Sequence, residues 1–406
     1  MRFTSLFAIV IVLVSAVPAL AVSGAGAIIL EFNTSVRAEG MGGAGVATHW
    51  GGDPGDWANP ALLAYQEGLR YSDMESHLVP DLADDIMLSN EQVTLGFGGF
   101  GIVLGRAPAD GTRLDMGQQI ATADDGTSLG TFDSWMTAER FGAGVSLFRF
   151  LETATGRSEP GISKMFDVSV GYSHIEFEDD LAPDEVTQDG RGGKGLAKTN
   201  SRGALARFTP LNTVGKTHAS GPLGGVRLSL AYGMSILNGG DEMIEHVDAD
   251  QSDPLPRSYV RGWSFHAETG FPPDIRRGLG KVRLGWLVES LTPLVSFGYA
   301  DQLIEPGIIW DDDAGDYRYE HDTSGRYDEK STGWELTIAN IWSMRRGHAE
   351  GWGGIDGDTS GSSLGFKLAG IGGARWDKAT VPQATGLRDV ERESWTVWVD
   401  LSRLMN

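Results

Sequence analysis

The sequence predicts an all-β fold, a transmembrane antiparallel β-barrel, and two patterns support this. Apolar and polar residues alternate with a period of two from the middle of the chain to its end, which is typical of strands with two unlike faces. Between these stretches lie long, acidic, glycine-rich segments of the kind that form loops. Behind the N-terminus no stretch approaches a membrane-spanning helix in length. A membrane-embedded chain of this kind must therefore be a closed barrel, because isolated strands cannot satisfy their backbone groups in lipid.

Residues 1–21 have the parts of a secretory signal peptide. Arg2 precedes an apolar run from Leu6 to Val17, and Ala19 and Ala21 form a small-residue cleavage site. We therefore expect export and cleavage after Ala21.

The strands are predicted from the alternation itself. Between Val226 and Ile236 every second residue is apolar, and the other face carries polar and small residues. The phase of the alternation slips at Gly98-Gly99, which indicates a two-residue hairpin turn within Gln92–Arg106. The remaining predicted strands are Leu69–His77, Leu114–Ala121, Gly142–Leu151, Phe166–Ser173, Tyr259–Thr269, Val282–Val288, Leu294–Tyr299, Trp334–Trp342, Leu364–Leu368 and Trp395–Leu401.

Four long segments are predicted as loops, namely Glu178–Lys198, Asp241–Pro256, Trp310–Lys330 and Gly351–Ser363. Long loops at one end and tight turns at the other are typical of outer-membrane barrels. A water-soluble β-sandwich would also alternate, because one face of each sheet packs on the core. The length of the chain, the lack of a domain break and the signal peptide favour the barrel.

The composition excludes several classes of function. A net charge of −22 argues against a nucleic-acid partner. Gly192–Thr199 resembles a phosphate-binding loop, but Ala197 replaces its second obligatory glycine. The chain has no cysteine, and its eight histidines lack metal-ligand spacing. We expect neither an enzyme nor a cofactor.

The acidic loops leave one question about metals open. Asp356 and Asp358 begin a pattern like that of a calcium loop, but Lys367 stands where the bidentate acid belongs. Divalent cations could still bind loosely at Asp311–Asp313 or at Asp248 and Asp250, although solvated turns are the simpler interpretation.

The most specific motif is the run Ser35–Leu63, which resembles the N-terminal signature of the FadL-like outer-membrane barrels, and most closely its PorV/PorQ branch. The matching positions are Arg37, Ala38, Gly40, Met41, Gly42, Gly45, Val46, Ala47, Asp53, Asn59, Pro60 and Ala61. The resemblance implies a barrel of about 14 strands at residues 67–406, with long acidic loops. It also implies an N-terminal hatch at residues 22–66, which folds into the lumen.

The residues of this motif suit a plug. Its glycines leave the backbone bare, so that it can lie flush against another surface. Asn59 and Pro60 read as the N-cap and first residue of a helix, and Arg37 and Asp53 are candidates for charge pairs with the wall. A plug that only stabilises the barrel and a plug that moves as a gate are equally compatible with the sequence. The candidate gating residues are Arg37, Gly40, Met41, Gly42, Gly45, Asp53, Trp57, Asn59 and Pro60.

For function, the resemblance implies passive transport of hydrophobic, fatty-acid-like compounds across the outer membrane. The alternatives are a PorV-like carrier or anchor for proteins of type IX secretion, and a purely structural barrel. The expected partners are outer-membrane lipid and either a hydrophobic small molecule or a secreted protein.

Overall fold

The computed structural model describes residues 26–51, 55–80, 83–106, 110–122, 127–156, 161–180, 193–213, 225–240, 243–245, 252–271, 290–311, 316–319, 328–351, 355–368, 371–383 and 387–401. Strands dominate this part of the chain. They are β1 Gly68–Val79, β2 Ala83–Phe97, β3 Phe100–Gly105, β4 Gly111–Thr122, β5 Ser128–Ser146, β6 Phe166–Asp180, β7 Lys194–Asn212, β8 Val226–Leu237, β9 Met243–Glu245, β10 Ser252–Pro254, β11 Ser258–Thr269, β12 Val295–Pro306, β13 Ile308–Asp311, β14 Asp316–Tyr319, β15 Glu329–Ile338, β16 Trp342–Glu350, β17 Asp356–Leu368, β18 Gly372–Val381 and β19 Val390–Val399.

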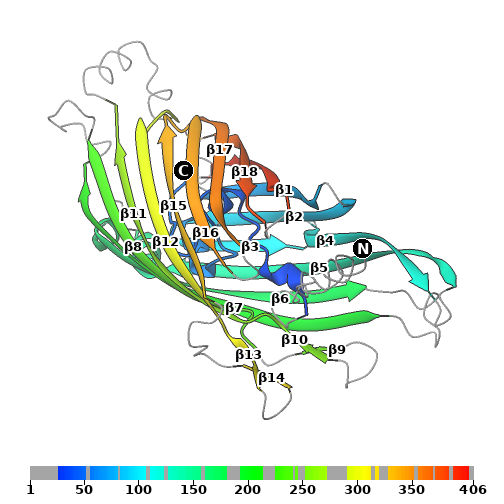
Figure 1. Ribbon diagram of the computed structural model, residues 1–406. Helices are drawn as coiled ribbons and strands as arrows, with labels where there is room; N and C mark the ends of the chain where they lie inside the picture. The colour runs from blue at the N-terminus through cyan, green and yellow to red at the C-terminus, as the bar shows by residue number, and fades with distance from the viewer. Residues whose placement is uncertain are drawn as a thin grey trace, which may run out of the picture.

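The strands form a closed antiparallel barrel (Figure 1). Closure follows from β1, which pairs with β2 on one side and with the last strand, β19, on the other. Three pieces of wall are split in two. The strands β3 and β4 both lie between β2 and β5. Beyond β7, β8 pairs with β11 and β9 pairs with β10, so β8 with β9 and β10 with β11 each form one piece of wall. Counted this way, the described residues form a wall of 14 strands. The small β13–β14 hairpin lies outside this wall.

The two ends of the barrel differ. We call the end with the two-residue Gly98-Gly99 turn the turn end, and the opposite end, where β6 ends and β7 begins, the loop end. Outer-membrane barrels place their short turns toward the periplasm, and this turn is the shortest connection between the wall strands, so we assign the turn end to the periplasmic side.

The outer face of the wall is apolar toward the turn end. In β8, the outward side chains of Leu230, Tyr232, Met234 and Ile236 are 46%, 49%, 50% and 38% exposed. Such a band of exposed large apolar residues is what a strand presents to lipid. The barrel is therefore of the transmembrane type.

Toward the loop end the same outer face becomes charged. In β6, the outward side chains are apolar or aromatic from Phe166 to Tyr172 and polar or charged from His174 to Asp180. The loop-side half of the strands thus extends past the apolar band into a polar environment.

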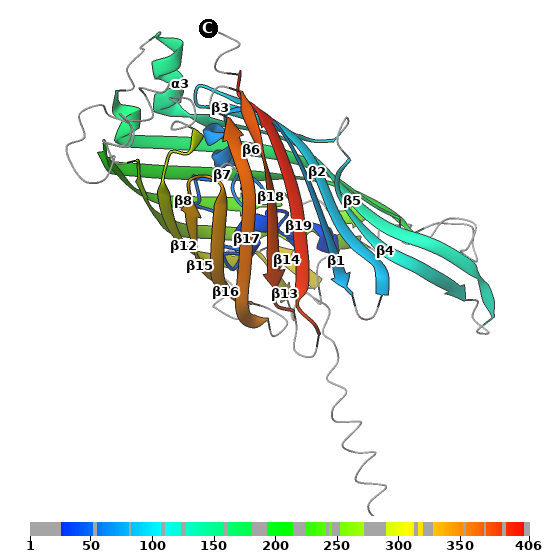
Figure 2. The ribbon, with the colours of Figure 1, turned by 90° about the horizontal axis from the view of Figure 1, so that it is seen from above.

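Helical segments are few and short. They are η1 Ile28–Glu31, α2 Val36–Glu39, η2 Pro60–Tyr65, α3 Leu147–Ala154 and η3 Ile162–Lys164. Among the described residues, no helix is both long and apolar enough to cross a membrane. Figures 1 and 2 show the N-terminal segment, in blue, enclosed by the strands.

Most of the predicted strands are confirmed, including the hairpin, in which Phe97 pairs with Phe100. Several boundaries are wrong. The prediction Gly142–Leu151 runs into α3, and Trp334–Trp342 runs through a turn into β16. All four predicted loops contain strand residues: Glu178–Lys198 the end of β6 and the start of β7, Asp241–Pro256 the short strands β9 and β10, Trp310–Lys330 β14 with parts of β13 and β15, and Gly351–Ser363 the first half of β17. The strands β7, most of β16 and β18 were not predicted, because polar residues and glycines on both faces weaken the alternation. The signal peptide and the strand Val282–Val288 lie outside the described residues.

Candidate functional site

The candidate site is the hatch segment, which we define as the described part of residues 26–66. Its backbone and side chains contact inward-facing residues on many sides of the barrel. The η2 turn packs on β3, β5, β6 and β7, and α2 packs on β17, β18 and β19. Almost every residue from Thr34 to Val46 is buried.

A row of wall glycines makes this close packing possible. At each of them a Cβ atom would collide with the hatch segment, for example at Gly171 with the backbone of Pro60 and at Gly333 with the backbone of Met41. Several are direct cross-strand neighbours: one run of four extends from Gly101 to Gly203, and two pairs join Gly233 to Gly262 and Gly333 to Gly347. We call this set the glycine belt: Gly101, Gly144, Gly171, Gly203, Gly233, Gly262, Gly298, Gly333 and Gly347.

Asn59 fixes one half of the hatch segment to the wall. Its side-chain oxygen accepts a hydrogen bond from Ala61 N at 3.0 Å, which caps η2, and Pro60 occupies the first helical position. Its Nδ2 donates to Val46 O at 2.8 Å and to Ala204 O of β7 at 3.1 Å. One fully buried amide therefore links the helical turn, the preceding loop and the barrel.

Arg37 fixes the other half through buried charge. Its guanidinium donates two hydrogen bonds, each of 2.8 Å, to the two carboxylate oxygens of Glu335 on β15. Arg345 donates to Glu335 at 2.6 Å and forms an ion pair with Asp377, with 2.8 Å between the charged atoms. All four side chains are at most 3% exposed, so the network is shielded from solvent. Removing one member of such a network costs about 3–5 kcal/mol, because a buried charge is left uncompensated.

Further charge pairs join the hatch segment to the wall. Arg140 of β5 forms a buried ion pair with Asp56 and covers the ring of Trp57, with 4.8 Å to the ring centroid. Arg392 lies 3.3 Å from Glu39. Burial raises the pKa of the Glu39 carboxyl above its ordinary value, and the Arg392 guanidinium opposes this shift.

The Arg140–Asp56 pair lies where the wall is interrupted. Gly105 of β3 pairs with Arg140, and the next pair is Thr112 of β4 with Ala138, so the segment between them leaves the ladder. Gln92 on the other neighbouring strand accepts a hydrogen bond from Arg140 at 2.8 Å. On the luminal side of this interruption, Arg140 thus connects the wall to Asp56 of the hatch segment.

On the loop side of the glycine belt the inner wall is apolar along β1, β2, β4 to β7, β9 and β18. Buried side chains from at least five strands converge there with Trp57 and with the first part of the hatch segment, residues 27–36. The wall contributes Met74, Leu78, Leu88, Leu114, Met136, Ala138, Ile175, Phe177, Ala197, Ile244, Leu255 and Ala379. Ile29 and Leu30 fill this space and are 0% and 3% exposed.

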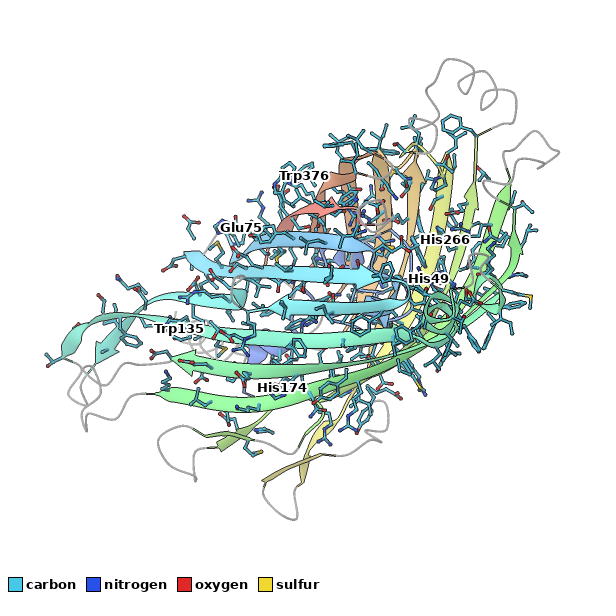
Figure 3. All side chains as sticks on the ribbon, turned by 180° about the vertical axis from the view of Figure 1, so that it is seen from behind. His49, Glu75, Trp135, His174, His266 and Trp376 are labelled. Atoms are coloured by element: carbon cyan, nitrogen blue, oxygen red, sulfur yellow. The ribbon has the colours of Figure 1, made fainter. Side chains whose placement is uncertain are left out.

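On the turn side of the belt the inner wall is polar. Tyr65 donates a hydrogen bond to Asp167 at 2.9 Å, and Arg227 lies 2.8 Å from Glu268. Figure 3 shows His49 of the hatch segment beside His266 of β11, and the two rings are 6.2 Å apart. The lumen therefore changes from apolar to polar along its axis, and the hatch segment lies at the boundary.

The remaining candidate residues also meet the wall. Gly42 and Met41 lie against β15 and β16, Gly40 against Gly361, and Gly45 N donates to Gln302 at 2.9 Å. Asp53 lies outside the described residues. The structure thus brings the other eight candidates into one plug, while their role as a gate remains a proposal.

Sequence reasoning missed the wall partners. Glu335 appeared only as a polar residue of the predicted strand Trp334–Trp342, and Arg345 and Arg140 lay outside the predicted strands. The glycine belt could have been predicted from the sequence, because a glycine in the interior of a strand often marks the close approach of another backbone.

Fold and site together describe a transmembrane β-barrel whose inner wall contacts its own N-terminal segment. No protein-family model matches the chain, and no curated protein does. Among solved structures, the chain is similar to the Ralstonia pickettii toluene transporter TbuX, with 13% identity, coverage of 91% of this chain and 97% of that chain, and a TM-score of 0.41. It is also similar to a Pseudomonas aeruginosa FadL homologue, with 11% identity, coverage of 90% and 98%, and a TM-score of 0.41. A third is a TodX deltaS2S3 mutant monoaromatic hydrocarbon channel, with 9% identity, coverage of 90% and 98%, and a TM-score of 0.45.

Proposed function

We propose that this protein transports hydrophobic, fatty-acid-like compounds passively across the outer membrane. The observation that carries the proposal is the apolar inner wall on the loop side of the glycine belt. Barrels that conduct water and polar solutes have polar lumens, so an apolar lumen suits an apolar ligand. A ligand entering from the loop end would meet this surface first.

In this proposal the hatch segment is the gate. Residues 27–36 cover the same apolar surface that a hydrophobic ligand would occupy, so ligand and segment compete for it. The Arg37–Glu335 pair and the Asn59 contacts hold the rest of the plug in place. Passage requires at least one of these attachments to open.

The test uses uptake of a fluorescent long-chain fatty acid by cells that carry the protein in the outer membrane. Asn59→Leu removes the cap and both backbone contacts, and Pro60→Gly loosens the start of η2. We expect both variants to change the uptake rate while the barrel still assembles, as shown by a heat-dependent gel shift. Normal transport by both folded variants would contradict the gating role.

The ligand class has its own test at Phe177, which lies in the apolar wall and is 2% exposed. Phe177→Asp places a charge on the proposed route and should reduce fatty-acid uptake. Glu178→Gln, its neighbour in β6 on the outer face, is the matched control and should leave uptake unchanged. Unchanged uptake in a folded Phe177→Asp barrel would argue against a hydrophobic ligand in this lumen.

The type IX carrier role rests on the PorV/PorQ resemblance of the hatch signature alone. Pull-down of exported proteins with the purified barrel tests that role separately.

A further inference from the structure

The short helix α3, between β5 and β6, has its polar face turned toward the protein. Arg149 donates to Glu67 at 2.7 Å and to Ala64 O at 3.5 Å. Glu152 accepts hydrogen bonds from the backbone and hydroxyl of Ser163 at 3.1 and 2.5 Å, and Thr153 donates to Gly98 O at 3.2 Å.

The apolar face of α3 is turned away from the protein. Leu147, Phe150 and Leu151 share one side of the helix at i, i+3 and i+4 spacing and are 43%, 45% and 58% exposed. In the adjacent η3 region, Ile162 and Met165 are 55% and 53% exposed. A surface helix of a water-soluble protein has the opposite polarity, because its apolar stripe faces the core.

The outward apolar face continues the lipid-facing band of the barrel. The rings of Phe148 in α3 and Phe166 at the start of β6 lie 5.9 Å apart. Phe166 begins the outward apolar row of β6, which includes Val170 and Tyr172. Figure 2 shows α3 at the ends of the strands, and its contact with the Gly98-Gly99 turn places it at the turn end.

We propose that α3 and the adjacent residues Ile162 and Met165 form an interfacial anchor that lies in the periplasmic leaflet of the membrane, with phospholipid covering the apolar face. Amphipathic helices bind in this way, with the apolar face in the boundary between headgroups and acyl chains. Exposed Lys164 lies beside this patch, where it can meet a lipid phosphate. Because Arg149 binds Ala64 O and Glu67, the anchor also attaches the end of the hatch segment to the membrane surface.

The test uses the absence of native cysteine. Leu151→Cys is labelled with an environment-sensitive fluorophore, and the barrel is reconstituted in vesicles of phosphatidylethanolamine and phosphatidylglycerol. Val170→Cys in the lipid-facing band is the positive control, and exposed Ser128→Cys at the loop end is the aqueous control. We expect brominated lipids to quench the Leu151 label about as strongly as the Val170 label and much more than the Ser128 label.

Two results would overturn the proposal. A Leu151 label quenched by aqueous iodide like the Ser128 label would place α3 in water. A label protected from both quenchers would show that protein, either this chain or a second copy, covers the face. A heat-dependent gel shift for each labelled variant establishes that the barrel is folded.

Discussion

At the scale of single residues, the close contact between the hatch segment and the wall depends on glycines, which have no side chain. Glycine weakens a strand because it has high conformational freedom and no side chain to pack. In the glycine belt this cost is offset, since backbone or side-chain atoms of the hatch segment lie where each Cβ atom would be. The plug thus lies directly against the wall.

Gly171→Ala tests this packing. The added methyl group collides with the backbone of Pro60 and Ala61, and overpacking of this kind costs about 1–3 kcal/mol. We expect the hatch segment to become more sensitive to protease while the barrel remains heat-modifiable. Gly105→Ala is the control, because its nearest neighbour is at an ordinary 3.6 Å. Equal protection in both variants would show that the belt does not hold the plug.

Arg37→Met tests the buried network. It leaves Glu335 with Arg345 as its remaining ion-pair partner and should destabilise docking of the hatch segment by a few kcal/mol. Arg261→Met removes the exposed Arg261–Glu305 pair, where a loss of at most about 1 kcal/mol is expected. Hydrogen exchange of the hatch backbone measures both effects. Similar exchange rates in the two variants would contradict the conclusion that the Arg37–Glu335 ion pair holds the hatch segment against the wall.

At the scale of elements, the hatch segment has two parts with different attachments. Residues 34–66 are held by hydrogen bonds and ion pairs to named wall residues. The first part, around η1, packs mainly through apolar side chains. Apolar packing lacks direction, so this part is the easier one for a hydrophobic ligand to replace.

Combined Ile29→Ser and Leu30→Ser substitutions test this competition. Both side chains are buried in the apolar cluster, and polar replacements weaken its packing on the wall. We expect the purified barrel to bind a fluorescent fatty acid more tightly, because the competing segment leaves more readily. Glu31→Gln, at an exposed neighbouring position, is the control. Unchanged or weaker binding in the double variant would contradict displacement.

At the scale of the whole molecule, the outer surface has an apolar half toward the turn end and a charged half toward the loop end. Only the apolar half suits a bilayer core. The loop-side half of the lumen, with the apolar part of its inner wall, therefore extends beyond the apolar band.

Fractionation of the cell envelope tests this arrangement. Expressed with its own leader, the protein should be found in the outer membrane and should migrate differently on a gel with and without boiling, because a closed barrel resists detergent. A soluble periplasmic protein without a heat-dependent shift would contradict the transmembrane barrel.

Features that depend on local pattern could be predicted from the sequence. Alternation revealed strands such as β8, the slip in its phase at Gly98-Gly99 revealed the hairpin, and the capping chemistry of Asn59 and Pro60 revealed η2. Both turn glycines do adopt positive φ in the structure. It could not distinguish the apolar residues of α3 from the end of a strand, because a short apolar run fits both.

The contacts of the hatch segment could not be predicted from local sequence, because its partners are far away along the chain. Arg37 and Glu335 are 298 positions apart, and Asn59 and Ala204 are 145 apart. Such contacts arise only when β1 meets β19 and the barrel closes around the N-terminal segment. That closure brings the wall charges, the glycine belt and the apolar lumen together in one site. The site could not be predicted from the sequence, because local sequence carries no information about which strands will face each other across a lumen.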